Sequence, residues 1–288
     1  MGFAEVEELI NDTERGASEL AADAAQALHH LDREEAEMYL VELLKERRAM
    51  APFINLANEF FLAVEKGKDH RPACKSFYER LSTSKKKIVE KSAELMEREE
   101  YSHVSTLSYS STVVKALERS EEVTVFESRP KKEGRKTAEQ LASETTVNYW
   151  IDAGMNKALK EVEAVFVGAD SVSAHSFTNK IGTYLLVLSA HRNNIPVHVL
   201  ADTTKYLPEG FTTAVEELHP SEEVWPHQNE NIRVHNDYFE PVPLDAHDGL
   251  YFVTERGIFD REGAAEEIEK KKVSNGLKKH HPENGVEG

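Results

Sequence analysis

The sequence predicts an α/β fold in which a helical N-terminal domain precedes a Rossmann-like domain built on a parallel sheet. Two observations carry this prediction. Up to about Glu100, apolar residues recur at helical spacings of three and four. After Glu100, short valine-rich runs alternate with helical stretches, as in successive βαβ units. The expected domains are therefore 1–100 and 101–260, followed by a charged C-terminal tail over 261–288.

The N-terminal half contains stretches of helical periodicity with little turn punctuation between them. They cover residues 5–31, 34–50, 52–67 and 76–100. Ala, Leu and Glu dominate these stretches, and none alternates apolar and polar residues as a half-buried strand would. We therefore expect this half to form a helical bundle or cap.

The C-terminal half is expected to alternate strands with helices. Strands are predicted over 103–108, 123–128, 146–152, 164–170, 196–202 and 249–257. Helices are predicted over 111–120, 136–144, 154–162 and 179–194. This alternation requires crossover connections, which make the strands parallel and place helices on both faces of the sheet. The charged residues after 261, interrupted by Gly, Pro and Asn, predict a frayed end.

Composition excludes several classes of protein. The 288 residues are 40% apolar, which is enough for a substantial core. The single cysteine, Cys74, excludes a disulfide framework and a thiolate zinc site, and no HExxH motif is present, so neither a metal nor a cofactor is expected. The N-terminus lacks a signal-peptide core and no run reaches roughly 18 apolar residues. We therefore expect a cytoplasmic protein without a membrane span.

The formal net charge of −17 argues against direct nucleic-acid binding and against binding to acidic membranes. The lysine runs at 85–87 and 270–272 are interpreted as solvated helix faces. The acidity fits either an ordinary acidic protein or adaptation to a high-salt cytoplasm. The sequence leaves both interpretations open.

Polar side chains collect where the predicted strands end. The stretch GADSVSAHSFTNKIGT, residues 168–183, follows one strand directly and is expected to be a loop with Asp170 at the strand's carboxyl end. Neighbouring strands should bring Ser108, Arg129 and Asp152 to the same edge. Open parallel sheets bind ligands outside the carboxyl ends of their strands, so this edge is the predicted ligand site. Alternatively, Asp170 only closes an Asx turn.

The chain resembles the initiation factor 2B alpha/beta/delta-related family through ESRP at 127–130, TAEQLA at 137–142, GAD at 168–170 and NKIGTY at 179–184. The resemblance extends over roughly 15–201. This family includes regulatory subunits of the guanine-nucleotide exchanger of a eukaryotic translation initiation factor. It also includes aldose–ketose isomerases acting on methylthioribose-1-phosphate and ribose-1,5-bisphosphate. The resemblance implies the same fold, a helical domain on a Rossmann-like one.

In the isomerases, the resemblance implies a catalytic pair formed by a cysteine after the first strand of the sheet and by the GAD aspartate. Asp170 matches the aspartate, but Ser108 stands in the position of the cysteine. A thiol has a pKa near 8.5 that can be tuned towards neutrality, whereas a serine hydroxyl needs an adjacent base. Ser108 is therefore expected to be inactive, and Asp170 alone leaves the acid–base pair incomplete. His103 or Tyr109 could substitute, although no spacing requires it.

The resemblance also implies residues that hold the phosphate of a ligand. They are Arg15, Gly16, Ala17, Arg48, Ser110, Arg129, Asn179 and Lys180. Asn179 and Lys180 are expected to open the helix over 179–194, with Gly182 letting a phosphate approach the backbone. Two of the cations also have a structural interpretation. Arg129 could pair with Glu127 or Asp152, and Arg15 could be an ordinary helix-surface charge.

The sequence therefore predicts an initiation factor 2B subunit-like protein that binds a sugar phosphate or nucleotide phosphate. A regulatory role is favoured because the isomerase cysteine is replaced by Ser108. The alternative is an aldose–ketose isomerase of a phosphorylated ribose, an intramolecular oxidoreductase in which Asp170 works with an unusual acid partner. A third interpretation is an assembly subunit with a vestigial pocket. Because family members pair through their C-terminal domains, we expect a homodimer or larger homo-oligomer.

Overall fold

The computed structural model describes residues 8–9, 12, 15–47, 50–213, 219–227 and 229–281. The helices are α2 (Ala17–His30), α3 (Arg33–Glu46), α4 (Ala51–Glu65), α5 (Arg71–Arg98), α6 (Ser111–Leu117), α7 (Gly134–Leu141), α8 (Met155–Ala158), α9 (Thr183–Asn193), α10 (Arg261–Glu269) and α11 (Asn275–His280). The strands are β1 (His103–Leu107), β2 (Glu122–Phe126), β3 (Thr146–Trp150), β4 (Ala164–Gly168), β5 (Ser171–Val172), β6 (Ser176–Lys180), β7 (Val197–Leu200), β8 (Phe239–Pro243), β9 (Leu250–Val253) and β10 (Ile258–Asp260). The α/β class with an N-terminal helical region is confirmed.

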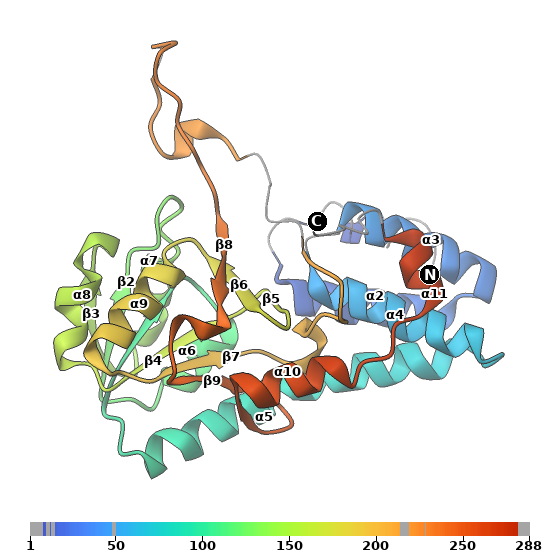
Figure 1. Ribbon diagram of the computed structural model, residues 1–288, viewed down its shortest axis with the longest axis horizontal. Helices are drawn as coiled ribbons and strands as arrows, with labels where there is room; N and C mark the ends of the chain where they lie inside the picture. Colours follow the sequence, from blue (N-terminus) through green and yellow to red (C-terminus); the bar gives the residue numbers. More distant parts are fainter. Residues whose placement is uncertain are drawn as a thin grey trace.

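Helices α2 to α4 pack beside the α/β part, and the long helix α5 extends from one to the other (Figure 1). The first third of α5 buries Cys74 and Phe77 in the core of the helical part. Its last third buries Ile88 and Leu95 against the sheet. One continuous helix therefore contributes to both cores, and burying apolar side chains at both ends joins the two parts.

The main sheet has seven strands in the order β10-β9-β7-β4-β1-β2-β3, and every pair is parallel except β10 with β9. Alternate residues of β4 point to opposite faces, as in any strand. Ala164 and Phe166 pack with α5 and α6, whereas Val165 and Val167 pack with α9 and α10. Helices therefore cover both faces, which confirms the expected crossover architecture.

Residues 168–183 form a hairpin rather than the expected loop. Strands β5, β6 and β8 make a separate antiparallel sheet, in which Lys180 pairs with Phe239 and Asn179 with Glu240. The expectation that Asn179 and Lys180 open a helix is therefore wrong, since α9 begins at Thr183. Gly182 separates strand from helix with φ of +98°, a left-handed conformation that glycine adopts at little cost. Pairing with a distant strand overrides the local helical pattern.

Residues 261–281 do not form a frayed end. Helix α10 buries Ala264 and Ile268 against the sheet, and α11 buries Leu277 against α4. The amide of Asn58 on α4 holds this segment as well, because its Oδ1 accepts from the Ser274 amide at 2.9 Å. The prediction of a frayed end was wrong because a few apolar residues among the lysines are enough to order this segment when they pack against α4 and the sheet.

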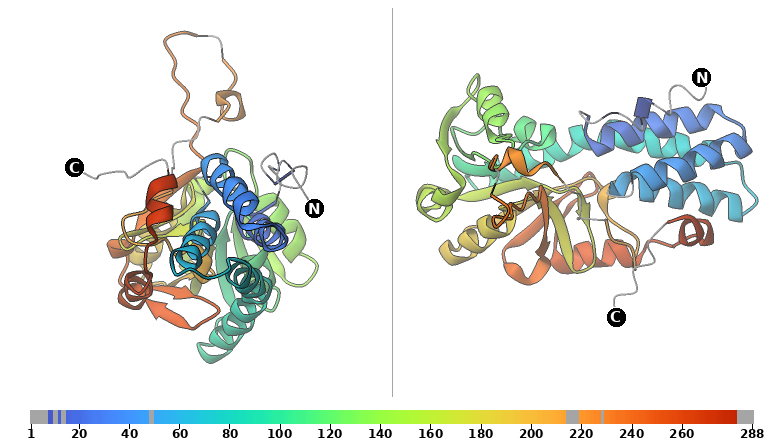
Figure 2. Two further views of the ribbon diagram at one scale, coloured as in Figure 1. Left: turned by 90° about the vertical axis from the view of Figure 1, so that its right-hand side faces the viewer. Right: turned by 90° about the horizontal axis from the view of Figure 1, so that it is seen from above.

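An arm formed by 219–227 and 229–238 projects away from the body and leads into β8 (Figures 1 and 2). Within the described ranges, no helix combines the length and the apolar character that a membrane crossing requires.

Candidate functional site

The carboxyl ends of β1, β2 and β4 lie side by side, so the segments that follow them meet at one edge of the sheet. Ser108 follows β1, Arg129 lies three residues after β2 and Asp170 lies two residues after β4. This edge brings together the polar residues that the sequence pattern placed there.

Ser108 is held by its backbone rather than by its hydroxyl. Its amide donates to Ser128 Oγ at 2.7 Å, and its carbonyl accepts from Thr137 Oγ1 at 2.7 Å. Ser108 and Ser128 both have positive φ, 70° and 65°, which is uncommon for residues other than glycine. The structure records no hydrogen bond between the Ser108 hydroxyl and any described residue.

Asp152 fixes the neighbouring turn through its carboxylate. Oδ1 accepts from the Ser128 amide and Oδ2 accepts from the Arg129 amide, each at 2.8 Å. The guanidinium of Arg129 instead donates from Nη2 to the Val224 carbonyl of the arm at 3.0 Å. Arg129 therefore contacts Asp152 through its backbone amide, and its guanidinium forms no ion pair with Glu127 or Asp152 in the described part of the chain.

Asp170 is partly buried between two lysines. Burial raises the pKa of its carboxyl, and the positive charges of Lys205 and Lys180 oppose that rise. Lys205 reaches this place from the segment after β7 and donates from Nζ to the Ala169 carbonyl at 2.6 Å. Lys205 was not among the predicted site residues, although it lies in the segment that follows the end of β7.

Lys180 is nearly inaccessible, with 2% of its surface exposed, and carries its own counter-ion. Its Nζ donates to Glu133 Oε1 at 2.7 Å and lies 4.7 Å from the centre of the Tyr238 ring. Glu133 immediately precedes α7 and is placed by Gly134, where a Cβ would lie only 1.8 Å from the Phe126 carbonyl oxygen. The other carboxylate oxygen of Glu133 is buried and has no partner among the described residues.

The start of α9 is also occupied by a carboxylate of the chain. Glu240 Oε1 accepts from the amides of Gly182 and Tyr184 at 2.7 and 2.9 Å. A helix N-terminus attracts anions because its first amides are unpaired and the helix dipole is positive there. Glu240 therefore takes the position where a phosphate was expected near Gly182. Asn179 donates from Nδ2 to Thr183 Oγ1 at 3.0 Å and helps to hold the same turn.

The remaining expected ligand residues have local structural partners. Arg15 donates to Asp12 at 2.6 Å and to Asp23 at 2.5 Å. Gly16 is the N-cap of α2, and Ala17 and Ser18 are the first two residues of this helix. The Ser18 hydroxyl donates to Asp202 Oδ2 at 3.1 Å. Helix α2 thus starts beside the end of β7.

Ser110 caps α6, where its Oγ accepts from the Val113 amide at 3.4 Å. Its side chain also lies close to Gly168, where a Cβ would approach Ser110 Cβ to 3.3 Å. Arg48 lies outside the described residues.

Taken together, this edge offers anion-binding groups that are already paired with acids or carbonyls. It contains one carboxyl with a raised pKa, Asp170, and no thiolate.

Cys74 is buried in the helical part, where burial raises the pKa of its thiol to about 12. Among the described residues, no three His, Cys, Asp or Glu side chains are grouped to hold a metal ion. A hollow of about 520 Å³ beside the end of α5 shares no residue with this edge.

Known proteins with the same arrangement identify the family. A model of the initiation factor 2 subunit family matches residues 13–261. The chain belongs to this family. A Pyrococcus furiosus member described as eIF-2B subunit 2-like is 30% identical over 270 residues, covering 88% of this chain and 94% of the relative. A member from Thermococcus kodakarensis named ribose 1,5-bisphosphate isomerase is 28% identical over 293 residues, covering 88% and 89%.

Solved structures of the initiation factor 2 subunit family share the fold. The Pyrococcus horikoshii translation initiation factor eIF-2B superposes with a TM-score of 0.71 at 26% identity, covering 89% of this chain and 96% of that one. Family members also form oligomers, as in a tetrameric eIF2B β2δ2 complex from C. thermophilum. The family thus contains both translation-factor subunits and sugar-phosphate isomerases.

Proposed function

We propose that this chain is a regulatory, non-catalytic member of the initiation factor 2 subunit family, which binds a phosphorylated sugar or nucleotide at the carboxyl edge without converting it. The observation that carries the proposal is Ser108, at the position of the isomerase cysteine. Isomerisation between adjacent sugar carbons needs an acid and a base with matched pKa values. The Ser108 hydroxyl has no recorded hydrogen bond to a base, and Cys74 is remote and buried.

The surroundings of Lys180 support binding of a ligand that carries both hydroxyl and phosphate groups. A buried carboxylate oxygen without a donor is costly, and the free oxygen of Glu133 would be satisfied by a sugar hydroxyl. Lys180 and Lys205 lie near Asp170 and supply positive charge for a phosphate. Binding would require partial exchange of the Lys180–Glu133 pair, so we expect modest affinity.

The alternative is an isomerase of a phosphorylated ribose, and one observation favours it. The raised pKa of Asp170 suits a carboxyl that donates and accepts protons. An unidentified second group would then have to replace the cysteine.

Phosphorus and proton NMR with ribose-1,5-bisphosphate, and then with methylthioribose-1-phosphate, distinguishes these functions. We expect line broadening without a ketose product from the native chain, and turnover from Ser108→Cys. Ketose formation by the native chain that Asp170→Asn abolishes would establish the isomerase instead. Absence of binding to either compound or to a nucleotide would favour an assembly role.

We further propose that the chain forms a homodimer or larger homo-oligomer through its α/β part. Helix α9 exposes 63% of Leu185 and 40% of Leu188, and Ile151, which follows β3, is 62% exposed. Exposed apolar side chains of this size on one helix are typical of an interface. A monomer in sedimentation equilibrium at micromolar concentration would contradict this proposal.

A further inference from the structure

A second polar hollow, of about 230 Å³, lies between the helical part and the C-terminal helices. Its walls come from α4, α5, the end of β9 and the end of α10, and it shares no residue with the carboxyl-edge site. The cationic residues of its lining are Arg80, Arg256, Lys270, Lys271 and Lys272. The acidic residues are Glu59 and Glu267. In a chain with a net charge of −17, this lining has a formal excess of positive charge.

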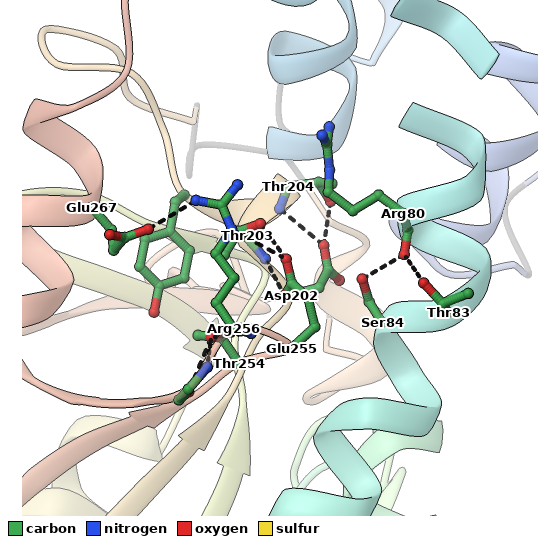
Figure 3. Close-up of polar contacts among 12 residues, drawn as sticks. Arg80, Thr83, Ser84, Asp202, Thr203, Thr204, Thr254, Glu255, Arg256 and Glu267 are labelled. Atoms are coloured by element: carbon green, nitrogen blue, oxygen red, sulfur yellow. Dashed lines mark hydrogen bonds and ion pairs between the residues drawn. The ribbon is translucent and has the colours of Figure 1, made fainter. Parts of the chain in front are cut away.

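Two arginines approach the hollow from opposite parts of the molecule, as Figure 3 shows for Arg80 on α5 and Arg256 after β9. Arg80 donates from Nη2 to Glu59 at 2.6 Å, and Arg256 donates from Nη1 to Glu267 at 2.9 Å. Each guanidinium has five N–H donors and these bonds use one of them, so donors remain for an oxyanion. Lys272 is exposed and has no recorded ion pair with a described residue.

The two acids behind the hollow accept hydrogen bonds from Thr203 and Thr204, and Glu255 Oε1 also lies 4.0 Å from Arg256 Nε. Glu255 accepts from the Thr203 amide at 3.0 Å and from its hydroxyl. Asp202 accepts from the Thr204 amide at 3.1 Å and from its hydroxyl. Counted with the lining, both carboxylates leave a formal positive charge only while Lys271 is protonated.

We propose that this hollow is an anion-binding site for a small phosphate-bearing molecule, either pyrophosphate or the phosphate end of a sugar phosphate. The planar fork of an arginine can donate two N–H bonds to two oxygens of a tetrahedral phosphate, so forks from two sides suit this group. The volume is below the roughly 300–1,000 Å³ of sites for drug-sized ligands, which favours a small anion or the phosphate end of a larger molecule. A bound anion would bridge α5 of the helical part to the ends of β9 and α10.

Lys271 makes the binding proton-linked. Its Nζ donates to Asn55 Oδ1 at 2.8 Å and to the Thr203 carbonyl at 2.9 Å, and burial lowers its pKa to about 7. The charged groups acting on it are Glu59 and Asp202, which raise its pKa, and Arg80 and Arg256, which lower it. A bound anion would stabilise the charged form of Lys271. Anion binding above pH 7 should therefore be accompanied by protonation of this lysine.

Titration calorimetry with inorganic pyrophosphate, with inorganic phosphate and with ribose-5-phosphate tests this site in the full chain. The variant Arg256→Gln/Lys272→Gln removes two exposed cations of the lining and should weaken binding at least tenfold. Lys279→Gln, which alters an exposed lysine of α11 outside the hollow, should leave affinity unchanged.

Equal affinity in the native chain and the double variant would overturn the proposal. The strongest of the three ligands identifies the source of the phosphate. At pH 8, titrations in two buffers of different ionisation enthalpy should report proton uptake. Absence of uptake would contradict the placement of the anion beside Lys271.

Discussion

Lys180 Nζ and Glu133 Oε1 lie 2.7 Å apart and join β6 to the start of α7 across 47 positions of the chain. The lysine side chain is 3% exposed and the glutamate side chain is 28% exposed. A charge buried this deeply needs a partner, because losing water costs it several kcal/mol. The pair therefore stabilises the carboxyl edge and also reduces the charge that Lys180 presents to a ligand.

Substitution of Glu133 by Gln should strengthen phosphate binding while lowering stability. The amide cannot neutralise Lys180, so we expect a loss of about 1–3 kcal/mol in the free energy of unfolding. Added inorganic phosphate should then raise the Tm of the variant more than that of the native chain. Glu139→Gln, on the exposed face of α7, is the matched control. Equal Tm increases in both variants would show that Lys180 does not bind phosphate.

Glu240 acts as a cap for α9, so removing it should destabilise the chain. In Glu240→Ala the amides of Gly182 and Tyr184 lose their acceptor, at a cost of about 1–2 kcal/mol. Glu240→Gln keeps an acceptor oxygen and loses only the charge, so its cost should be smaller. Urea denaturation measures both, with the exposed Asp245→Asn as control. Equal stability of all three variants would contradict a capping role.

His198 should make the fold sensitive to acid. It is 3% exposed among Phe166, Tyr101 and Tyr251, and neither ring nitrogen has a partner among the described residues. Burial lowers its pKa from 6.5 to about 4. Between these values the unfolded chain binds the proton more readily, so stability falls as pH drops from 6.5 to 4, by at most roughly 1.4 kcal/mol per pH unit.

The variant His198→Phe isolates this effect from the carboxylates that titrate in the same range. Its free energy of unfolding should depend less steeply on pH between 6.5 and 4 than that of the native chain. His235→Gln, an exposed histidine of the arm, should keep the native slope. An unchanged slope in His198→Phe would show that this histidine does not control acid stability.

Cys74 should not react with thiol reagents in the folded protein. It is fully buried, and its pKa of about 12 keeps it protonated at pH 8. We expect no labelling by a chromogenic disulfide reagent under native conditions. In about 8 M urea, which unfolds the chain, we expect one equivalent of label. Rapid native labelling would place an accessible thiol in the molecule and would reopen the search for the missing isomerase group.

Several features followed from sequence patterns because they depend on local periodicity. Valine-rich strands between helices predict a parallel sheet, and strand ends in a parallel sheet share one edge, so the placement of Ser108 and Asp170 at that edge was predictable. The resemblance to the family also implied that Ser108 stands in the position of the isomerase cysteine, which stays a prediction. These properties involve neighbours in the chain or a single position.

The sequence by itself thus determined the fold class, and through the family resemblance it predicted the loss of the catalytic thiol. Only the tertiary structure decided that residues 168–183 form a hairpin, because Lys180 pairs with Phe239 of β8. Only the tertiary structure placed Glu133 on Lys180 and Glu240 on the start of α9, across 47 and 58 positions. Such pairs leave no periodic signal, because they form only when packing brings distant segments within hydrogen-bonding distance and removes water from between them.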